Sequence, residues 1–305
     1  MKKIKIGLPR ALLYHRYGVL WKNFFELLGC NVVISPETNK QILELGINNT
    51  IDEACLSYKI YVGHVLYLSN ICDYILITRV CDYGKKDKVC TRLNGTYDDI
   101  KNKIPLYQIL DYDIEYTKFK FPIFGFIKIG LKFTKNIIKI IYSYLIAKKK
   151  QKKHNIHLSN REKNKLQKNH KKILIISHSY NISDKFISTY VKDYLKNNNI
   201  IPIYSTNIDK KQTLPFSEYF SNTLYWKYQK ENIGSFYYLQ NQIDGVIFLS
   251  TYPCGIDTLV NNLLILKNKN IPMLNIIIDS FVSELNLETK LESFIDIINK
   301  GDLNE

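Results

Sequence analysis

Short apolar runs of strand length alternate with segments of helical spacing, and this alternation constrains the fold more than any other feature of the chain. In the first third, the apolar runs predict strands at Lys3–Gly7, Asn31–Ser35 and Tyr74–Thr78. The segments between them, Tyr14–Leu28 and Ser57–Leu68, repeat apolar residues every three or four positions, as amphipathic helices do. Strands separated by helices of this length pair in parallel, with helices on the faces of the sheet.

A second unit of the same kind begins at Lys172. Strands are predicted at Ile173–Ser177, Ile200–Tyr204, Val246–Ser250 and Met273–Asp279, with helices at Ile187–Leu195, through Tyr225 and Tyr237, and at Leu291–Ile298. We therefore expect an α/β protein with two Rossmann- or flavodoxin-like parallel-sheet domains, a cleft between them and a helical bridge. The expected limits are 1–120 for the first domain, 121–171 for the bridge and 172–305 for the second domain.

The expected bridge carries most of the net charge of +15. Between residues 128 and 172 there are fifteen lysines and arginines against a single acid, Glu162. Four lysines in its first part recur every three or four residues and so share one helical face: Lys128, Lys132, Lys135 and Lys139. Lysines through the centre of this apolar segment exclude a membrane-spanning helix. The tract 148–172 is polar and mostly without a period, which favours an inter-domain linker.

Two uses of this basic segment stay open. A helix packed across the two domains with a solvated lysine face is favoured over a helix lying on an anionic membrane surface. Nucleic-acid binding is less favoured, because no aromatic residues interleave with the basic run and no binding motif is recognisable. We therefore expect no nucleic-acid partner and no membrane span.

The six cysteines are expected in a reducing compartment. The N-terminus has no apolar run of signal-peptide length before Pro9, which predicts a cytoplasmic protein. In that compartment cysteines point to metal binding, catalysis or burial rather than to disulfides. No C-x-x-C pair is present, so scattered thiol ligands would have to converge through the fold.

Three cysteines fall where ligands bind in open α/β sheets, at the carboxyl ends of strands or at helix starts. Cys254 lies in the loop between a strand and a helix, and Cys90 follows the strand Tyr74–Thr78 across a charged loop. Cys55 precedes a helix, and Lys59 follows one turn later, where its charge stabilises a thiolate or an anionic cluster.

The other three cysteines are weaker candidates. Cys81 lies nine residues before Cys90 and competes with it for the same role. Cys30 and Cys72 fall where a helix hands over to a strand, which is the amino end of a sheet and the wrong end for a site. We interpret Cys30 and Cys72 as packing residues.

Other polar residues near the predicted strand ends are Arg10, His178 and His64. Arg10 ends the first strand, where it binds an anion or forms an ion pair, and the sequence leaves both roles open. His178 ends the first strand of the second half and is favoured as a functional residue facing the cleft. His64 is favoured as a structural histidine.

Motifs in both halves resemble the 2-hydroxyacyl-CoA dehydratase superfamily, in the branch of proteins related to the acyl-CoA dehydratase activase. The motifs that carry the resemblance are Ile6-Gly-Leu-Pro-Arg-Ala-Leu, Trp21-Lys-Asn-Phe-Phe-Glu-Leu-Leu-Gly, Ser35-Pro-Glu-Thr-Asn-Lys, Cys55 with Gly63-His-Val, Asp73-Tyr-Ile-Leu-Ile-Thr-Arg, Cys90-Thr-Arg-Leu-Asn-Gly, His178-Ser-Tyr-Asn-Ile-Ser-Asp, Pro253-Cys-Gly-Ile-Asp and Thr289-Lys-Leu-Glu-Ser-Phe-Ile-Asp. The resemblance covers both halves in order and lapses in the basic bridge.

The resemblance implies a 4Fe-4S cluster, or a sulfide-bridged double-cubane pair, held by the thiolates of Cys55, Cys90 and Cys254. It also implies a separate ATP-dependent iron–sulfur activase as electron donor. The chain has no phosphate-binding G-x-x-x-x-G-K-[ST] loop, so we expect it to receive the electrons. The implied chemistry is that of a dehydratase-like lyase or a double-cubane-type reductase, acting on a small substrate such as an acyl-CoA. Arg10 and His178 would be its catalytic residues.

The alternative is a non-catalytic cluster- or zinc-binding accessory protein that docks on an activase or a dehydratase. A homodimer and a heterodimer are both open. Relatives usually carry Cys-Gly-Pro-Asp where this chain has Cys254-Gly-Ile-Asp257, and their Thr-Arg is Thr289-Lys290 here. These differences leave the predicted thiolate ligands in place. Because of them, the resemblance does not assign the relatives' substrate to this chain.

Overall fold

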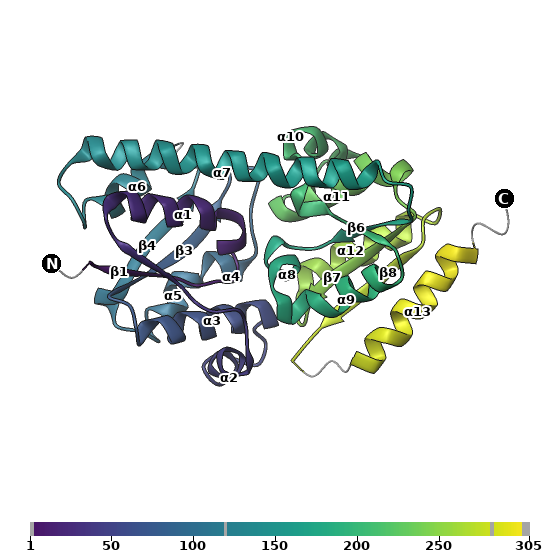
Figure 1. The fold of residues 1–305 in the computed structure, drawn as a ribbon, viewed down its shortest axis with the longest axis horizontal. Coiled ribbons are helices and arrows are strands. Elements are labelled where there is room, and N and C mark those ends of the chain that lie inside the picture. The colour runs from purple at the N-terminus through teal and green to yellow at the C-terminus, as the bar shows by residue number, and fades with distance from the viewer. Residues whose placement is uncertain (1–2, 119–120, 281–283, 301–305) are drawn as a thin grey trace. The chain divides into compact units, whose positions relative to one another are not determined.

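The structure, a computed structural model that describes residues 3–118, 121–280 and 284–300, confirms the predicted α/β class (Figure 1). It contains two four-stranded sheets in which all paired strands are parallel. The first sheet consists of β1 (Lys5–Leu8), β2 (Asn31–Ile34), β3 (Tyr74–Asp82) and β4 (Ile109–Glu115), in the order β2-β1-β3-β4. The second consists of β5 (Lys172–Ile176), β6 (Ile201–Tyr204), β7 (Gly245–Thr251) and β8 (Met273–Ile278), in the order β6-β5-β7-β8.

Helices connect these strands. In the first half they are α1 (Tyr14–Leu28), α2 (Lys40–Asn48), α3 (Leu56–Ser69), α4 (Thr91–Asn94), α5 (Thr96–Ile100), α6 (Ile123–Gly130) and α7 (Ile137–Leu166). In the second half they are α8 (Ser179–Ser183), α9 (Lys185–Asn197), α10 (Lys210–Thr213), α11 (Lys227–Leu239), α12 (Gly255–Lys267) and α13 (Glu284–Lys300). Figure 1 shows α1 and α6 on one face of the first sheet and α3 on the other.

The chain divides into two compact units. The first unit runs to Asn155 and includes Tyr225–Lys227, and the second comprises Ile156–Leu224 and the residues from Tyr228 onward. The short segment Tyr225–Lys227 joins the first unit through backbone hydrogen bonds with Lys88, whose N–H donates to the Tyr225 carbonyl at 2.8 Å. This pairing holds the loop that leads from β3 to Cys90.

Both units share one topology. In each sheet the first strand lies inside, the second strand lies on one side of it and the third on the other. The strand order therefore reverses between β1 and β3 in the first unit, and between β5 and β7 in the second. In open parallel sheets such a reversal opens a crevice at the carboxyl ends of the two strands, which is where ligands usually bind.

The first unit is built on apolar helix faces that match their spacing in the sequence. Trp21, Phe24 and Phe25 of α1 are buried, and the helix ends at Gly29 with φ +99°, a left-handed conformation that glycine adopts without strain. Phe24 packs edge-on against Phe126 of α6, with ring centroids 4.8 Å apart. These contacts cover one face of the first sheet.

Helix α7 differs from the sequence-based expectation. It continues to Leu166 and therefore includes most of the tract 148–172, which was predicted to be a linker without a period. The buried side of its second half is polar, with Gln151, Ser159 and Glu162 all buried. Glu162 accepts hydrogen bonds from Lys165 at 2.9 Å and from the Tyr204 N–H at 3.2 Å. An apolar period could not reveal a helix whose inner face is polar.

No helix among the described residues is both long and apolar enough to cross a membrane.

Candidate functional site

Cys55 and Cys90 of the first unit both stand at the N-cap of a helix. Cys55 caps α3 and Cys90 caps α4, each with extended backbone angles, φ −64° and ψ 149° for Cys55 and φ −66° and ψ 155° for Cys90. In a parallel sheet with crossover helices, a helix starts at the carboxyl edge of the strands, so the topology places both cysteines at the edge where such sheets usually bind ligands. The backbone N–H groups of a first helical turn have no hydrogen-bond acceptor within the helix, so they favour negative charge there.

A contact between their first turns links these two helix starts. The Arg92 guanidinium lies 5.9 Å from the centre of the Tyr58 ring, and the Tyr58 hydroxyl donates to Asp99 of α5 at 2.8 Å. Tyr58 follows Cys55 by three residues, and Arg92 follows Cys90 by two. The structure thus brings two of the three predicted ligands to neighbouring helix starts. Burial, followed by the charge and hydrogen bond of Asp99, raises the pKa of Tyr58 and keeps this hydroxyl protonated.

Cys81, the competitor of Cys90, lies within strand β3. Burial raises the pKa of the Cys81 thiol, and the nearby Arg79 only partly offsets this. A strand position with a raised pKa favours the protonated thiol, whereas a helix N-cap favours a thiolate. On these grounds Cys90 stays the stronger candidate.

Cys30 and Cys72 lie directly before β2 and β3, at the amino ends of the strands, as predicted. Burial raises the pKa of the Cys30 thiol to about 11 and that of the Cys72 thiol to about 11. Cys72 is buried against Gly7 of β1, where an added Cβ would lie 3.2 Å from the Cys72 sulfur. These features support the packing role.

Lys59 and Arg10 also lie in the first unit. Lys59 is half-buried one turn into α3, and its N–H donates to the Cys55 carbonyl at 3.0 Å. Arg10 follows β1 at the carboxyl edge, and its guanidinium forms an ion pair with Glu37 at 3.6 Å. The ion-pair role of Arg10 is therefore present. The Arg10 Nε is buried and has no hydrogen-bond partner among the described residues. This N–H is therefore available to bind an anion, so the anion-binding role stays open as well.

His64 is structural, as predicted. It is fully buried in α3, and its Nε2 lies 3.1 Å from the Thr38 hydroxyl. Burial, together with the charges of His15 and Arg10, lowers the pKa of His64 to about 3. The imidazole is therefore neutral at physiological pH.

In the second unit, the Asp257 carboxylate contacts three side chains, those of Cys254, His178 and Gln229. Cys254 caps α12, and His178 caps α8 directly after β5. Asp257 Oδ1 accepts a hydrogen bond from Gln229 Nε2 at 2.6 Å and lies 3.1 Å from His178 Nε2. The Cys254 thiol is also hydrogen-bonded to this carboxylate. The predicted residues Cys254 and His178 cap different helices and thus share Asp257 as a partner.

Asp257 is charged although it is buried. Burial raises its pKa, but the charge and hydrogen bond of His178 and the hydrogen bonds of Cys254 and Gln229 outweigh burial and lower the pKa below its usual value. His178 itself is held by two rings, stacked on Tyr180 at 4.8 Å and edge-on to Tyr228 at 5.6 Å. The imidazole is therefore fixed in orientation on both sides.

Sequence reasoning did not assign roles to Asp257 and Gln229. The spacing of Asp257, three residues after Cys254, places both on the first turn of one helix and could have indicated a contact. Gln229 lies on α11, far from both in the sequence, and no local pattern marks it.

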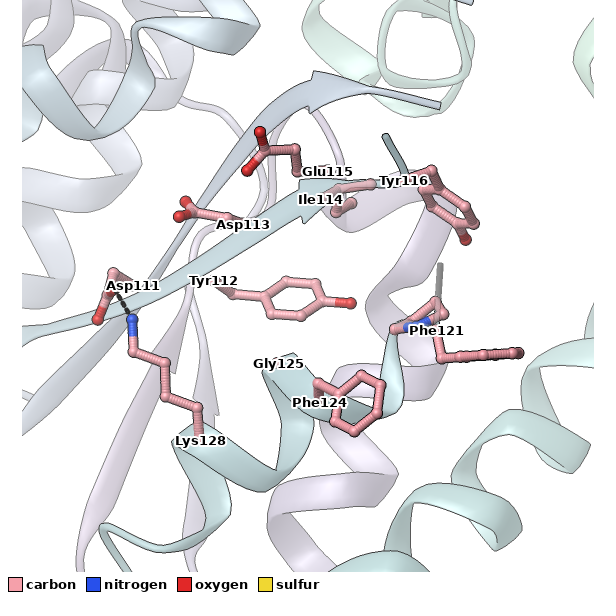
Figure 2. A pocket seen from close by; sticks show the side chains of 11 residues that line it. Asp111, Tyr112, Asp113, Ile114, Glu115, Tyr116, Phe121, Phe124, Gly125 and Lys128 are labelled. Carbon is pink, nitrogen blue, oxygen red and sulfur yellow. Dashed lines mark hydrogen bonds and ion pairs between the residues drawn. The ribbon is translucent and has the colours of Figure 1, made fainter. Parts of the chain in front are cut away.

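A separate pocket of about 250 Å³ lies between β4 and α6 in the first unit (Figure 2). Tyr112 and Phe124 form its aromatic wall, and an ion pair of 2.6 Å between Lys128 and Asp111 closes one end. Gly125 allows this packing, since an added Cβ would lie 2.6 Å from the Tyr112 ring. None of the predicted ligands lines this pocket, so the candidate site is assigned from the cysteine positions instead.

No group of three or more Cys, His, Asp or Glu side chains among the described residues is arranged to hold a metal ion. Cys55 and Cys90 belong to the first unit, and Cys254 belongs to the second. The predicted three-cysteine set thus stays a prediction.

Comparison with known families decides the relationship of the chain. The model of the family described as the CoA enzyme activase uncharacterised domain (DUF2229) matches residues 5–208. The chain belongs to this family. The matched segment contains Arg10, Cys55, Cys90 and His178, while Cys254 lies beyond it. No curated protein matches the chain. The family description ties this CoA enzyme activase-related protein to activases and leaves its dehydratase branch unassigned.

Proposed function

We propose that this activase-related protein binds an iron–sulfur cluster through Cys55, Cys90 and Cys254 and receives low-potential electrons from an ATP-dependent activase. The observation that carries the proposal is that each of the three cysteines is the N-cap residue of a helix at the carboxyl edge of a parallel sheet. Helix N-termini lower thiol pKa values and favour anions. Cysteine thiolates are the usual ligands of a 4Fe-4S cluster, which takes four, so a set of three leaves one iron open. The chemistry of the donors therefore fits the group.

The cluster would supply electron transfer and an open iron for a small substrate, of which an acyl-CoA is the class suggested by the sequence resemblance. The protein residues have simpler tasks. Cys55, Cys90 and Cys254 would bind the iron, and the positive ends of α3 and α12 would favour the negative charge of the cluster, by about 0.3–1 kcal/mol for each helix.

Asp257 has a positioning role in this proposal. In the thiol form Cys254 is hydrogen-bonded to Asp257, but a metal-bound thiolate has no proton to donate. The carboxylate then keeps Gln229 and His178 as its donors, which hold it in place. His178 would present its other ring nitrogen for proton transfer, and Arg10 its buried Nε–H for an anionic group.

Anaerobic purification of the full chain, followed by iron, sulfide and zinc analysis, tests this function. We expect iron and acid-labile sulfide in equal amounts and an EPR signal after reduction. An iron–sulfur activase supplied with ATP and a reductant should then produce the same signal in this protein. Zinc in place of iron, or a cluster that the activase does not reduce, would support the non-catalytic accessory protein instead. A protein without metal would contradict both.

A further inference from the structure

The segment from Lys118 to Arg161 contains no aspartate or glutamate and twelve lysines and arginines. The part of this segment within α7 presents one side to the first unit. Ile140, Tyr144 and Ala147 are buried there, and Gln151 accepts the Leu20 N–H at 2.9 Å. This inner side faces α1 (Figure 1). The contacts therefore also determine which residues of α7 face solvent.

In the first half of α7, three large apolar residues lie along one line of its outer side. Ile138 is 81% exposed, Tyr142 59% and Leu145 53%. Their spacing of four and three residues places them along one line on the helix surface. Lys149 and Lys152 continue the same line after Leu145, again at spacings of four and three. We call these residues, together with Lys153, the α7 ridge.

The lysines of the α7 ridge are available to a partner. Among the residues that the structure describes, Lys149, Lys152 and Lys153 are exposed and take part in no ion pair. The carboxylates of α1 and α7 are already engaged: Glu26 of α1 pairs with Lys22 at 3.8 Å, and Glu162 of α7 is buried. The ridge therefore combines exposed apolar side chains with uncompensated positive charge.

We propose that the α7 ridge docks the protein on an anionic lipid surface, with Ile138, Tyr142 and Leu145 entering the headgroup region and the lysines contacting acidic headgroups. This is the combination by which amphipathic helices bind anionic membranes without crossing them. A nucleic acid would leave Ile138 and Leu145 without a matching surface. A second copy of the chain would bring like charges together. The inference does not depend on an iron–sulfur cluster.

Flotation of the full-length protein with lipid vesicles tests this proposal. We expect binding to vesicles of equal parts phosphatidylcholine and phosphatidylglycerol, weakened by high salt, and little binding to phosphatidylcholine alone. Replacing Lys149, Lys152 and Lys153 by Gln should weaken binding about 100-fold, which corresponds to about fivefold for each lysine near the surface. Ile138→Ser, Tyr142→Ser and Leu145→Ser together should weaken it about tenfold or more.

Matched control variants separate the ridge from overall charge and hydrophobicity. The triple change of Lys40, Lys196 and Lys269 to Gln removes the same charge from exposed positions elsewhere. The triple change of Tyr107, Leu285 and Ile297 to Ser removes the same residue types from comparably exposed sites. Both controls should bind vesicles as the wild type does.

Several outcomes would overturn the proposal. They are absence of vesicle binding, equal binding to both lipid compositions, and ridge variants that bind like their controls. Binding of duplex DNA or RNA, or ridge-dependent dimers in sedimentation, without vesicle binding would assign the ridge to those partners instead. Circular dichroism of each variant confirms that a loss of binding is not a loss of folding.

Discussion

Asp257 Oδ1 lies 3.1 Å from Nε2 of His178, although 79 residues separate the two in the sequence. The pair joins the carboxyl end of β5 to the first turn of α12, directly beside Cys254. It is buried, so its geometry does not depend on solvent-exposed side chains. The Asp257 carboxylate thus contacts both the imidazole of His178, whose orientation is fixed, and the predicted metal ligand Cys254.

Replacing Asp257 by Asn should destabilise the protein. The change removes the charge that pairs with His178 and should lower the free energy of unfolding by about 2–3 kcal/mol at pH 7. Urea unfolding of the wild type and the variant measures the difference. Asp98→Asn, at an exposed ion pair with Lys101, is the matched control and should leave the unfolding midpoint unchanged. An Asp257→Asn protein as stable as the wild type would show that the pair is not formed.

The contribution of Asp257 also has a defined pH dependence. Its pKa is lower in the folded protein than in the unfolded chain, where aspartate titrates near about 3.9. Its stabilisation is therefore present above this pH and is lost as pH falls through the lower folded value. The difference between the wild type and the Asn variant should shrink in acid.

The sequence predicted much of the fold because the strands are apolar and the helices amphipathic. Strand β4 was not predicted, although Leu110, Tyr112 and Ile114 alternate with acidic residues along it. Strand β4 lies at the edge of the sheet. Its acidic side chains form ion pairs, such as that of Asp113 with Arg79 of β3 at 2.8 Å. Arg79 lies in the part of β3 that extends to Asp82, beyond the predicted end of this strand at Thr78.

The candidate site could be predicted only where topology determines it. Cys55, Cys90 and Cys254 each follow a break before a helical pattern, so their helix-start positions are readable from the sequence. The partners of a buried carboxylate are not readable in this way. Gln229 reaches Asp257 because α11 packs beside α12's first turn, and such long-range packing leaves no local signal.

His64 should not titrate above pH 5. Because its folded pKa is about 3 and the unfolded value is about 6.5, only the unfolded chain takes up this proton as pH falls between them. The free energy of unfolding should decrease by about 1.4 kcal/mol per pH unit from this residue. Proton NMR of the imidazole resonances measures the pKa directly, and His64→Asn should remove this part of the pH slope. A His64 resonance with a midpoint near neutrality would contradict the structural assignment.

Gly63 should be essential for the packing of α3 against α2. An added Cβ would overlap the Ile42 carbonyl, and a backbone atom cannot rotate away. Gly63→Ala should therefore lower the free energy of unfolding by about 1–3 kcal/mol, measured in urea. Gly255→Ala, where an added Cβ meets nothing within 4 Å, is the control and should be tolerated. Equal stability of the two variants would mean that α2 and α3 are not in close contact.

The lysines of the basic segment should be separate from the metal chemistry. Replacing Lys148, Lys149, Lys150, Lys152 and Lys153 by Gln changes only exposed positions on α7. Iron and sulfide per chain should equal those of the wild type, whatever happens to vesicle binding. A variant that folds but loses its iron would refute this separation.

The central claim is that Cys55, Cys90 and Cys254 jointly bind one iron–sulfur cluster, and the most direct test is iron and sulfide content measured for each cysteine variant after anaerobic purification. Cys55→Ala, Cys90→Ala and Cys254→Ala should each lose the cluster and its EPR signal. Cys30→Ala and Cys72→Ala should retain it, at a cost of about 1 kcal/mol in stability, and Cys81→Ala should retain it as well. Retention of a full cluster by any folded variant of the first three, or its loss in Cys81→Ala but not in Cys90→Ala, would contradict the assignment.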